Sequence, residues 1–88
     1  MRVTINVLYR EALYLLKEKG YKISSHSSDK DAVIINYKSK YGRKDTFAIE
    51  KDDEGFYVYS IITCRDFIEI ISQRNHLANL RLFIEREL

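Results

Sequence analysis

The chain contains no proline, no tryptophan and a single cysteine among its 88 residues. Because Cys64 has no second cysteine to pair with, an intramolecular disulfide is excluded, and small secreted domains usually need several. No apolar run approaches the roughly 18–20 residues of a membrane-spanning helix, and Arg10 and Glu11 interrupt the N-terminal segment where a signal peptide needs an apolar core. We therefore expect a cytoplasmic protein without a membrane association.

Residue types suited to catalysis or metal binding are also scarce. The three glycines are dispersed along the chain, which excludes a glycine-rich phosphate loop. His26, His76 and Cys64 are the only soft metal ligands, and no two of them have a ligand spacing such as C-x-x-C or H-x-x-x-H. Ser25, His26 and Asp29 occupy one polar stretch, where neighbouring side chains point in unrelated directions and do not assemble a catalytic triad. We expect no metal, no cofactor and no enzymatic activity.

The composition is typical of a single globular domain over residues 1–88. Hydrophobic residues make up 45% of the chain and charged residues 32%, which is not a disordered composition. A chain of this length supports one apolar core. The formal net charge of +2 is too small to indicate a polyanionic partner by itself, so that argument depends on local clusters of charge.

Residues 6–19 are predicted to form an amphipathic helix. Apolar residues recur there at helical spacing, Asn6 is suited to be the N-cap, and Gly20 supplies the left-handed residue that ends a helix. An alternative remains for residues 1–7, where apolar residues alternate and a short leading strand is also compatible with the pattern.

Four strands are predicted to follow this helix. The connections between them are short, which favours hairpins and therefore an antiparallel meander. The polar residues 24–31 are predicted to be a loop, because their side chains compete with regular structure for backbone hydrogen bonds. The predicted strands are 21–24, 32–38, 46–50 and 56–62.

The C-terminal third is predicted to be helical. Cys64, Phe67, Ile68 and Ile71 share one apolar face, but the apolar positions change phase after a break near residues 74–76, so two helices are expected. The predicted fold class is therefore α+β, with the element order α-β-β-β-β-α-α and an antiparallel meander sheet packed against helices on one face.

The segment 37–44 combines positive charge with aromatic residues around one predicted hairpin. Lysine and arginine side chains bind phosphates, and an exposed tyrosine stacks on a base. A charged hairpin end that keeps a sheet edge soluble is the alternative interpretation. The candidate nucleic-acid-binding residues are Lys38, Lys40, Tyr41, Arg43 and Lys44.

A second predicted turn is acidic, with Asp52, Asp53 and Glu54 at its tip. Clustered carboxylates imitate phosphates towards a basic partner surface, although such runs are also common in solvated turns. In an antiparallel meander the acidic and basic turns lie at opposite ends of the sheet, so the domain is expected to be dipolar.

Tyr57 and Tyr59 share one face of their strand, with Ile61. Tyrosine is favoured at interfaces because it offers a large area and a polar tip at low entropic cost. These residues are candidates for binding a partner if that face is exposed. The alternative, that a C-terminal helix covers this face, is equally compatible with the sequence.

The N-terminal part of the chain contains the opening Ile5-Asn6-Val7-Leu8-Tyr9-Arg10-Glu11, the lysine-rich helix end, Tyr21-Lys22-Ile23, the polar stretch and the Val33-Ile34-Ile35 strand. In these segments the chain resembles small phage-encoded anti-CRISPR inhibitors of Cas9. The resemblance implies a non-enzymatic inhibitor in the host cell cytoplasm, with an α-β-β-β-α-α fold, that occupies the surface reading the recognition motif of the DNA. The acidic residues available for such a surface are Asp29, Asp31, Asp52, Asp53 and Glu54.

These observations lead to one expected function and two alternatives. The first is a small binding protein that inhibits or modulates a host macromolecule, a protein or a nucleoprotein complex. The second is a nucleic-acid-binding regulator that uses the 37–44 hairpin. The third is a self-associating structural subunit, so both a monomer and a homodimer are compatible with the sequence.

Overall fold

The computed structural model describes residues 4–51, 53, 55–60, 68–71 and 76–88. Within these ranges the chain forms a helix, five strands and a second helix. The elements are α1 (Ile5–Glu18), β1 (Lys22–Ser28), β2 (Ala32–Lys38), β3 (Lys44–Lys51), β4 (Phe56–Ser60), β5 (Ile68–Ile71) and α2 (His76–Glu87).

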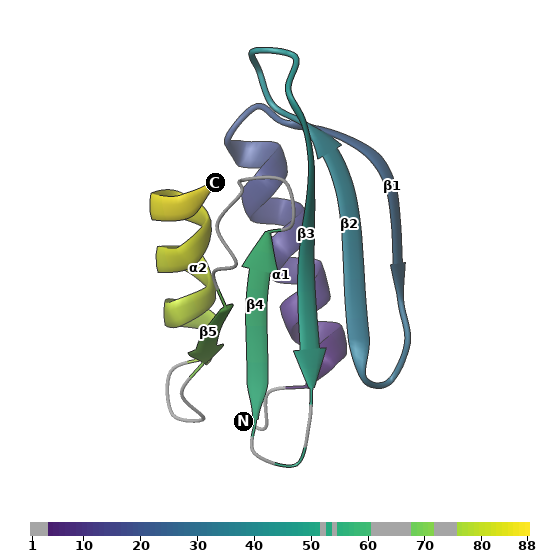
Figure 1. Ribbon diagram of the computed structural model, residues 1–88, viewed down its shortest axis with the longest axis vertical. Coiled ribbons are helices and arrows are strands. Elements are labelled where there is room, and N and C mark those ends of the chain that lie inside the picture. The colour runs from purple at the N-terminus through teal and green to yellow at the C-terminus, as the bar shows by residue number, and fades with distance from the viewer. Residues whose placement is uncertain (1–3, 52, 54, 61–67, 72–75) are drawn as a thin grey trace.

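The five strands form one sheet in the order β1-β2-β3-β4-β5, and each neighbouring pair is antiparallel (Figure 1). Tight turns make this order possible. In the β1–β2 turn the amide of Asp29 donates to the carbonyl of Ala32 at 2.9 Å, and in the β2–β3 turn the amide of Ser39 donates to the carbonyl of Arg43 at 2.7 Å. Such short connections cannot reach a parallel neighbour. The predicted α+β class and antiparallel meander are confirmed.

Helix α1 begins at Ile5, and the side chain of Thr4 caps it by accepting a hydrogen bond from the amide of Val7 at 3.3 Å. Asn6, the predicted cap, therefore lies inside the first turn. The helical alternative holds from Ile5 onwards, while residues 1–3 lie outside the described residues. Gly20, at a φ of 84°, follows the last turn as predicted, since this left-handed conformation costs glycine little.

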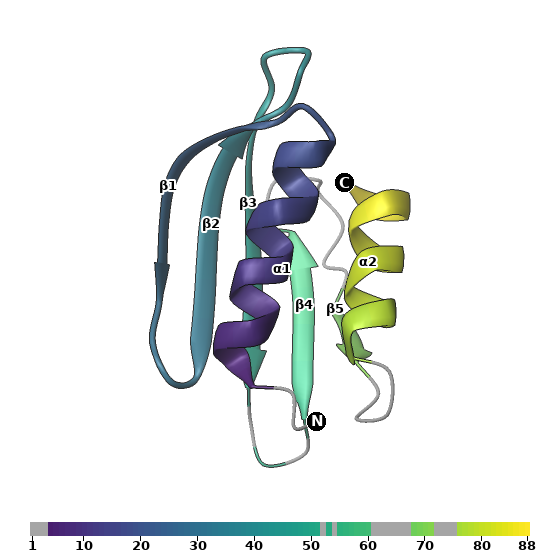
Figure 2. The same ribbon diagram turned by 180° about the vertical axis from the view of Figure 1, so that it is seen from behind.

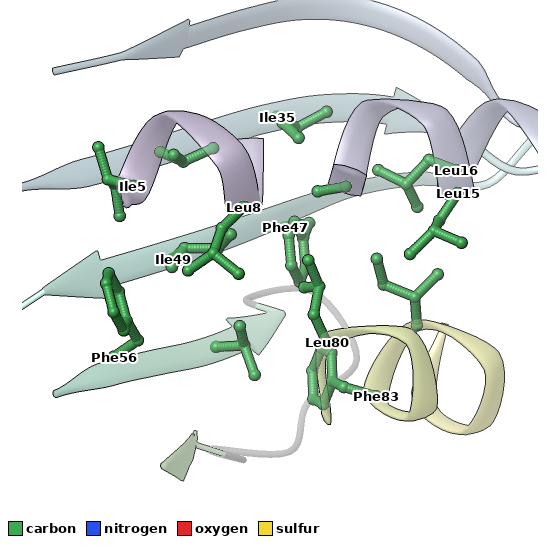
Figure 3. Close-up of a cluster of buried hydrophobic side chains, with 14 of the residues drawn as sticks. Ile5, Leu8, Leu15, Leu16, Ile35, Phe47, Ile49, Phe56, Leu80 and Phe83 are labelled. Atoms are coloured by element: carbon green, nitrogen blue, oxygen red, sulfur yellow. The ribbon is translucent and has the colours of Figure 1, made fainter. Parts of the chain in front are cut away.

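Both helices pack on the same face of the sheet (Figure 2), as predicted. Side chains from α1, α2 and the central strands meet there in one core (Figure 3), in which the rings of Phe47 and Phe83 lie 5.8 Å apart. The fully buried members include Leu8, Leu16, Val33, Ile35, Phe47, Ile49, Val58, Leu80 and Ile84.

Two predicted elements were wrong. Residues 24–28 belong to β1 and not to a loop, because pairing with β2 satisfies their backbone groups even though their side chains are exposed. Ile68–Ile71, predicted as helix, form β5, in which Ile71 pairs with Phe56 and Ile68 with Tyr59. Three of its four residues are β-branched, and pairing covers an edge that β4 would otherwise expose.

The rest of the predicted first C-terminal helix, at 61–67 and 72–75, lies outside the described residues. The second of the two predicted helices agrees with α2, which begins at His76, close to the predicted break.

Candidate functional site

The sheet has one face towards the helices and an outer face on which neither α1 nor α2 lies (Figures 1 and 2). Along β4, Phe56 and Val58 are buried in the core, whereas Tyr57 and Tyr59 alternate with them and are half-buried. Because successive side chains point to opposite sides of a strand, both tyrosines lie on the outer face. Of the two alternatives that the sequence left open, cover by α1 or α2 does not occur, since neither of these helices lies on this face.

Three lysines lie in one row across the outer face. Lys22 is directly opposite Lys38, and Lys38 is directly opposite Lys44. Neighbouring strands are about 4.8 Å apart, so the three Cα atoms fall within roughly 10 Å. All three side chains are exposed, and no carboxylate of the described residues forms an ion pair with them. We call these residues the lysine row.

A β-bulge brings Lys22 into the lysine row. The pairing of β1 with β2 shifts between Ile23 and Ser25, so Ile23 is opposite Tyr37 while Ser25 is opposite Asn36. Strict alternation from Ser25 would direct Lys22 towards the helices and Ile23 towards solvent. The extra residue reverses both, because Ile23 then packs against the core. Lys22 was not among the residues predicted from the sequence, since no local signal specifies this register.

The β2–β3 hairpin projects beyond the neighbouring strands at the top of Figure 1. The hydroxyl of Ser39 accepts hydrogen bonds from the amides of Tyr41 and Arg43, at 3.3 and 3.1 Å, and holds the turn. Tyr41 is 86% exposed, and the Nζ of Lys40 lies 5.3 Å from the centre of its ring. The structure thus brings all five predicted basic-aromatic residues to this end of the sheet.

The lysine row and this hairpin together place five exposed cations at one end of the sheet, which we call the basic end. Its members are Lys22, Lys38, Lys40, Tyr41, Arg43 and Lys44.

A polar row lies next to the lysine row on the outer face. The amide of Asn36 donates to the hydroxyl of Ser25 at 2.9 Å, and the hydroxyl of Thr46 donates to the carbonyl oxygen of Asn36 at 2.7 Å. The three residues come from three adjacent strands and are opposite one another. These hydrogen bonds hold the Asn36 amide in one orientation beside the lysines.

The tyrosines lie further along the same face. Tyr59 is opposite Ala48, which is only 2% exposed, and Ala48 is opposite Ile34, which is 46% exposed. The hydroxyl of Tyr59 donates to the Oε1 of Glu50 at 2.5 Å. This hydrogen bond to a carboxylate raises the pKa of Tyr59 to about 12 and restrains the position of its hydroxyl.

A buried network supports the basic end from the helix side of the sheet. The carboxylate of Asp45 accepts hydrogen bonds from the hydroxyls of Tyr37 and Ser60, at 3.0 and 2.7 Å. Burial and the neighbouring Asp45 raise the pKa of Tyr37 far above its usual value. The ring of Tyr21 stacks on Tyr37 at a centroid distance of 5.3 Å. These contacts fix the base of the hairpin in the strand pairs beside the lysine row.

The β1–β2 turn and the end of β3 lie together at the other end of the sheet from the basic end, and we call this region the acidic end after its predicted carboxylates. The amide of Lys51 donates to the carbonyl of Asp31 at 2.7 Å and ties the end of β3 to the β1–β2 turn. Asp29 has a local role, because its Oδ1 accepts from the amides of Asp31 and Ala32. Asp53 is exposed.

Two of the predicted acidic residues, Asp52 and Glu54, lie outside the described residues. Lys30 and Lys51 are exposed among the remaining carboxylates, so the described part of the acidic end has less uniform charge than the basic end.

The described residues give little support to metal binding or to a catalytic site. No three histidine, cysteine, aspartate or glutamate side chains among them are grouped to hold a metal ion. His76 is buried against the ring of Phe56, and burial lowers its pKa. His26 lies on the other side of the domain, hydrogen-bonded to the hydroxyl of Tyr9. The two histidines and Asp45 are on separate parts of the fold.

No helix in the described part of the chain is long and apolar enough to cross a membrane. Comparisons with models of protein families, with curated proteins and with solved structures found no match. A function for this chain is therefore inferred from the residues of the outer face.

Proposed function

We propose that this chain is a non-catalytic binding protein that holds nucleic acid on the basic end and the outer face of its sheet. The observation that supports the proposal is the lysine row. Like charges directly opposite one another destabilise a sheet, and no described carboxylate offsets the repulsion between Lys22, Lys38 and Lys44. A phosphate backbone neutralises such a row and releases its own counterions.

The buried network favours a binding function over a merely solubilising one. A charged hairpin that only protects a sheet edge has no need of a rigid base, whereas the base of this hairpin is held by Tyr37, Asp45 and Ser60. Rigid presentation of charged groups lowers the entropy that binding costs. Tyr41, at the projecting tip, adds an exposed ring beside the cations.

The test is a titration of labelled oligonucleotides at several salt concentrations. Five cations in contact with phosphates predict a slope of log affinity against log salt of about −3 to −5. Replacing Lys22, Lys38 and Lys44 with alanine should weaken binding and make this slope shallower by about 2 to 3. In a matched control, alanine replaces Arg10, Lys30 and Arg86, which are exposed on other parts of the domain. This control variant loses the same number of positive charges.

Loss of binding in both triple variants would show that only net charge matters, and it would overturn the assignment to the lysine row. Absence of binding by the natural chain at low salt would overturn the proposal as a whole.

The acidic end supports a second candidate, an inhibitor of a host protein or nucleoprotein complex. The hydrogen bond from Lys51 to Asp31 places the exposed Asp31 beside the end of β3, and clustered carboxylates there would imitate phosphates towards a basic partner. The resemblance to anti-CRISPR proteins makes guide-loaded Cas9 the first partner to examine, in the cytoplasm of a host cell. Inhibition of DNA cleavage that Asp31→Lys with Asp53→Lys abolishes would support it, and unimpaired cleavage would exclude this target.

A further inference from the structure

The outer face presents three kinds of side chain in order along its strands: the lysine row, the polar row of Ser25, Asn36 and Thr46, and then Tyr59. Each two-residue step along a strand is about 7 Å, so Tyr59 lies roughly 13–14 Å from the lysine row when measured along the strand direction. Cations bind phosphates of any nucleic acid, but a tyrosine ring stacks on a base only where that base is unpaired.

Tyr59 is fixed in position before any ligand arrives. Its hydroxyl is bonded to Glu50, and the residue opposite, Ala48, is small and covered. An aromatic side chain with one orientation loses little entropy when a base stacks on it. Tyr59 is half-buried, and it belongs to the sheet face on which neither α1 nor α2 lies.

The charges on this face also orient a ligand. Lysines lie at one end of the face, and Glu50 lies beyond Tyr59 towards the other end. A phosphate backbone is attracted to the first and repelled from the second. A single strand satisfies both by placing phosphates on the lysines and a neutral base on Tyr59. A duplex, with its bases stacked inside and a second phosphate backbone outside, would bring negative charge towards Glu50.

We infer that the ligand of this face is single-stranded nucleic acid, with phosphates on the lysine row and an unstacked base on Tyr59. This inference rests on the proposed function and specifies its substrate class. The Asn36 amide, held by Ser25 and Thr46, lies in the polar row between these two sites. The chemistry is shared by DNA and RNA, since the argument uses phosphates and base faces only.

The experiment compares four labelled probes of one sequence, namely single-stranded DNA, single-stranded RNA and the two corresponding duplexes, at fixed salt. Single strands should bind at least about tenfold more tightly than duplexes. Tyr59→Ala should weaken single-strand binding by about 5- to 150-fold, the range for one stacked base, and leave duplex binding and the salt slope unchanged. Tyr59→Phe keeps the ring and should retain most of the affinity.

Tyr14→Ala is the matched control, because Tyr14 is 55% exposed on α1, away from the outer face, and also hydrogen-bonds a glutamate, Glu18. The natural chain provides a second measurement that does not depend on how the variants fold. Irradiation with a bromouracil-containing single strand should crosslink Tyr59 and not Tyr14, as mapped by mass spectrometry.

Each outcome decides between the two claims. Equal or tighter duplex binding, an unaffected Tyr59→Ala variant or crosslinking away from Tyr59 would overturn this inference and leave the proposed function standing. Absence of binding to all four probes would overturn both. A preference for RNA over DNA among single strands would identify the source of the ligand and support the inference.

Discussion

Tyr37 and Asp45 face each other across β2 and β3, and the hydroxyl of Tyr37 donates to the Oδ2 of Asp45 at 3.0 Å. Both residues are buried beneath the base of the projecting hairpin, where Asp45 also accepts from Ser60. The next pair of opposite residues on these strands, Lys38 and Lys44, belongs to the lysine row on the other face of the sheet. A structural hydrogen bond and a candidate binding surface thus share one hairpin.

Removing the acceptor should cost more stability than removing one donor. Asp45→Ala leaves the hydroxyls of Tyr37 and Ser60 buried without their partner, and it should lower the free energy of unfolding by about 2–4 kcal/mol. Tyr37→Phe removes one hydrogen bond and should cost about 1 kcal/mol. Urea denaturation measures both. Asp53→Ala, at an exposed position, should change stability by less than about 0.5 kcal/mol, and an equal loss there would contradict the assignment.

The central residue of the lysine row should limit stability. Lys38 is flanked by Lys22 and Lys44, so Lys38→Gln should raise the free energy of unfolding by about 0.2–1 kcal/mol at low salt. The gain should shrink as salt screens the repulsion. The same substitution should weaken oligonucleotide binding. Lys30→Gln, in an exposed turn at the other end, is the control, and a destabilised Lys38→Gln variant would argue that the row is not repulsive.

Burial of His76 predicts a loss of stability at acidic pH. Its pKa is lowered in the folded chain from the usual 6.5, so the unfolded chain binds a proton at a higher pH than the folded chain does. The contribution of neutral His76 is complete above about pH 6.5 and is lost progressively as the pH falls towards its folded pKa.

Thermal or urea denaturation between about pH 5 and 7.5 measures this effect. His76→Phe keeps a ring against Phe56 without a titrating group and should flatten this part of the profile. His26→Gln, at the exposed histidine, should leave it in place. A profile that His76→Phe does not alter would assign the acid sensitivity to other groups.

The attachment of α2 depends on Phe83. Its ring meets Phe47 from β3 at 5.8 Å and is 2% exposed, so Phe83→Ala should cost about 3–5 kcal/mol. Leu82, its neighbour in sequence, is 45% exposed, and Leu82→Ala should cost less than about 1 kcal/mol. Denaturant midpoints give the comparison. Similar losses in both variants would mean that α2 does not pack through Phe83.

Local sequence patterns were sufficient to predict several features of the fold. The periodicity of apolar residues and Gly20 located α1 to within about one residue, since helix ends depend on nearby side chains. Short turns between β-branched segments predicted the antiparallel meander, because two strands joined by a few residues can pair in only one way. The basic hairpin at 37–44 was visible for the same reason, as all its residues are neighbours in the chain.

Features that depend on distant contacts were decided by the tertiary structure alone. The spacing of apolar residues around Ile68 and Ile71 suits a helix, but pairing with β4 makes this segment a strand. The bulge that turns Lys22 outwards follows from the burial of Ile23 against the core. Likewise, neither α1 nor α2 lies on the tyrosine face, because both helices pack on the other side of the sheet. Strand register and helix placement are set by which apolar side chains reach one shared core, and that competition is settled between segments far apart in the sequence.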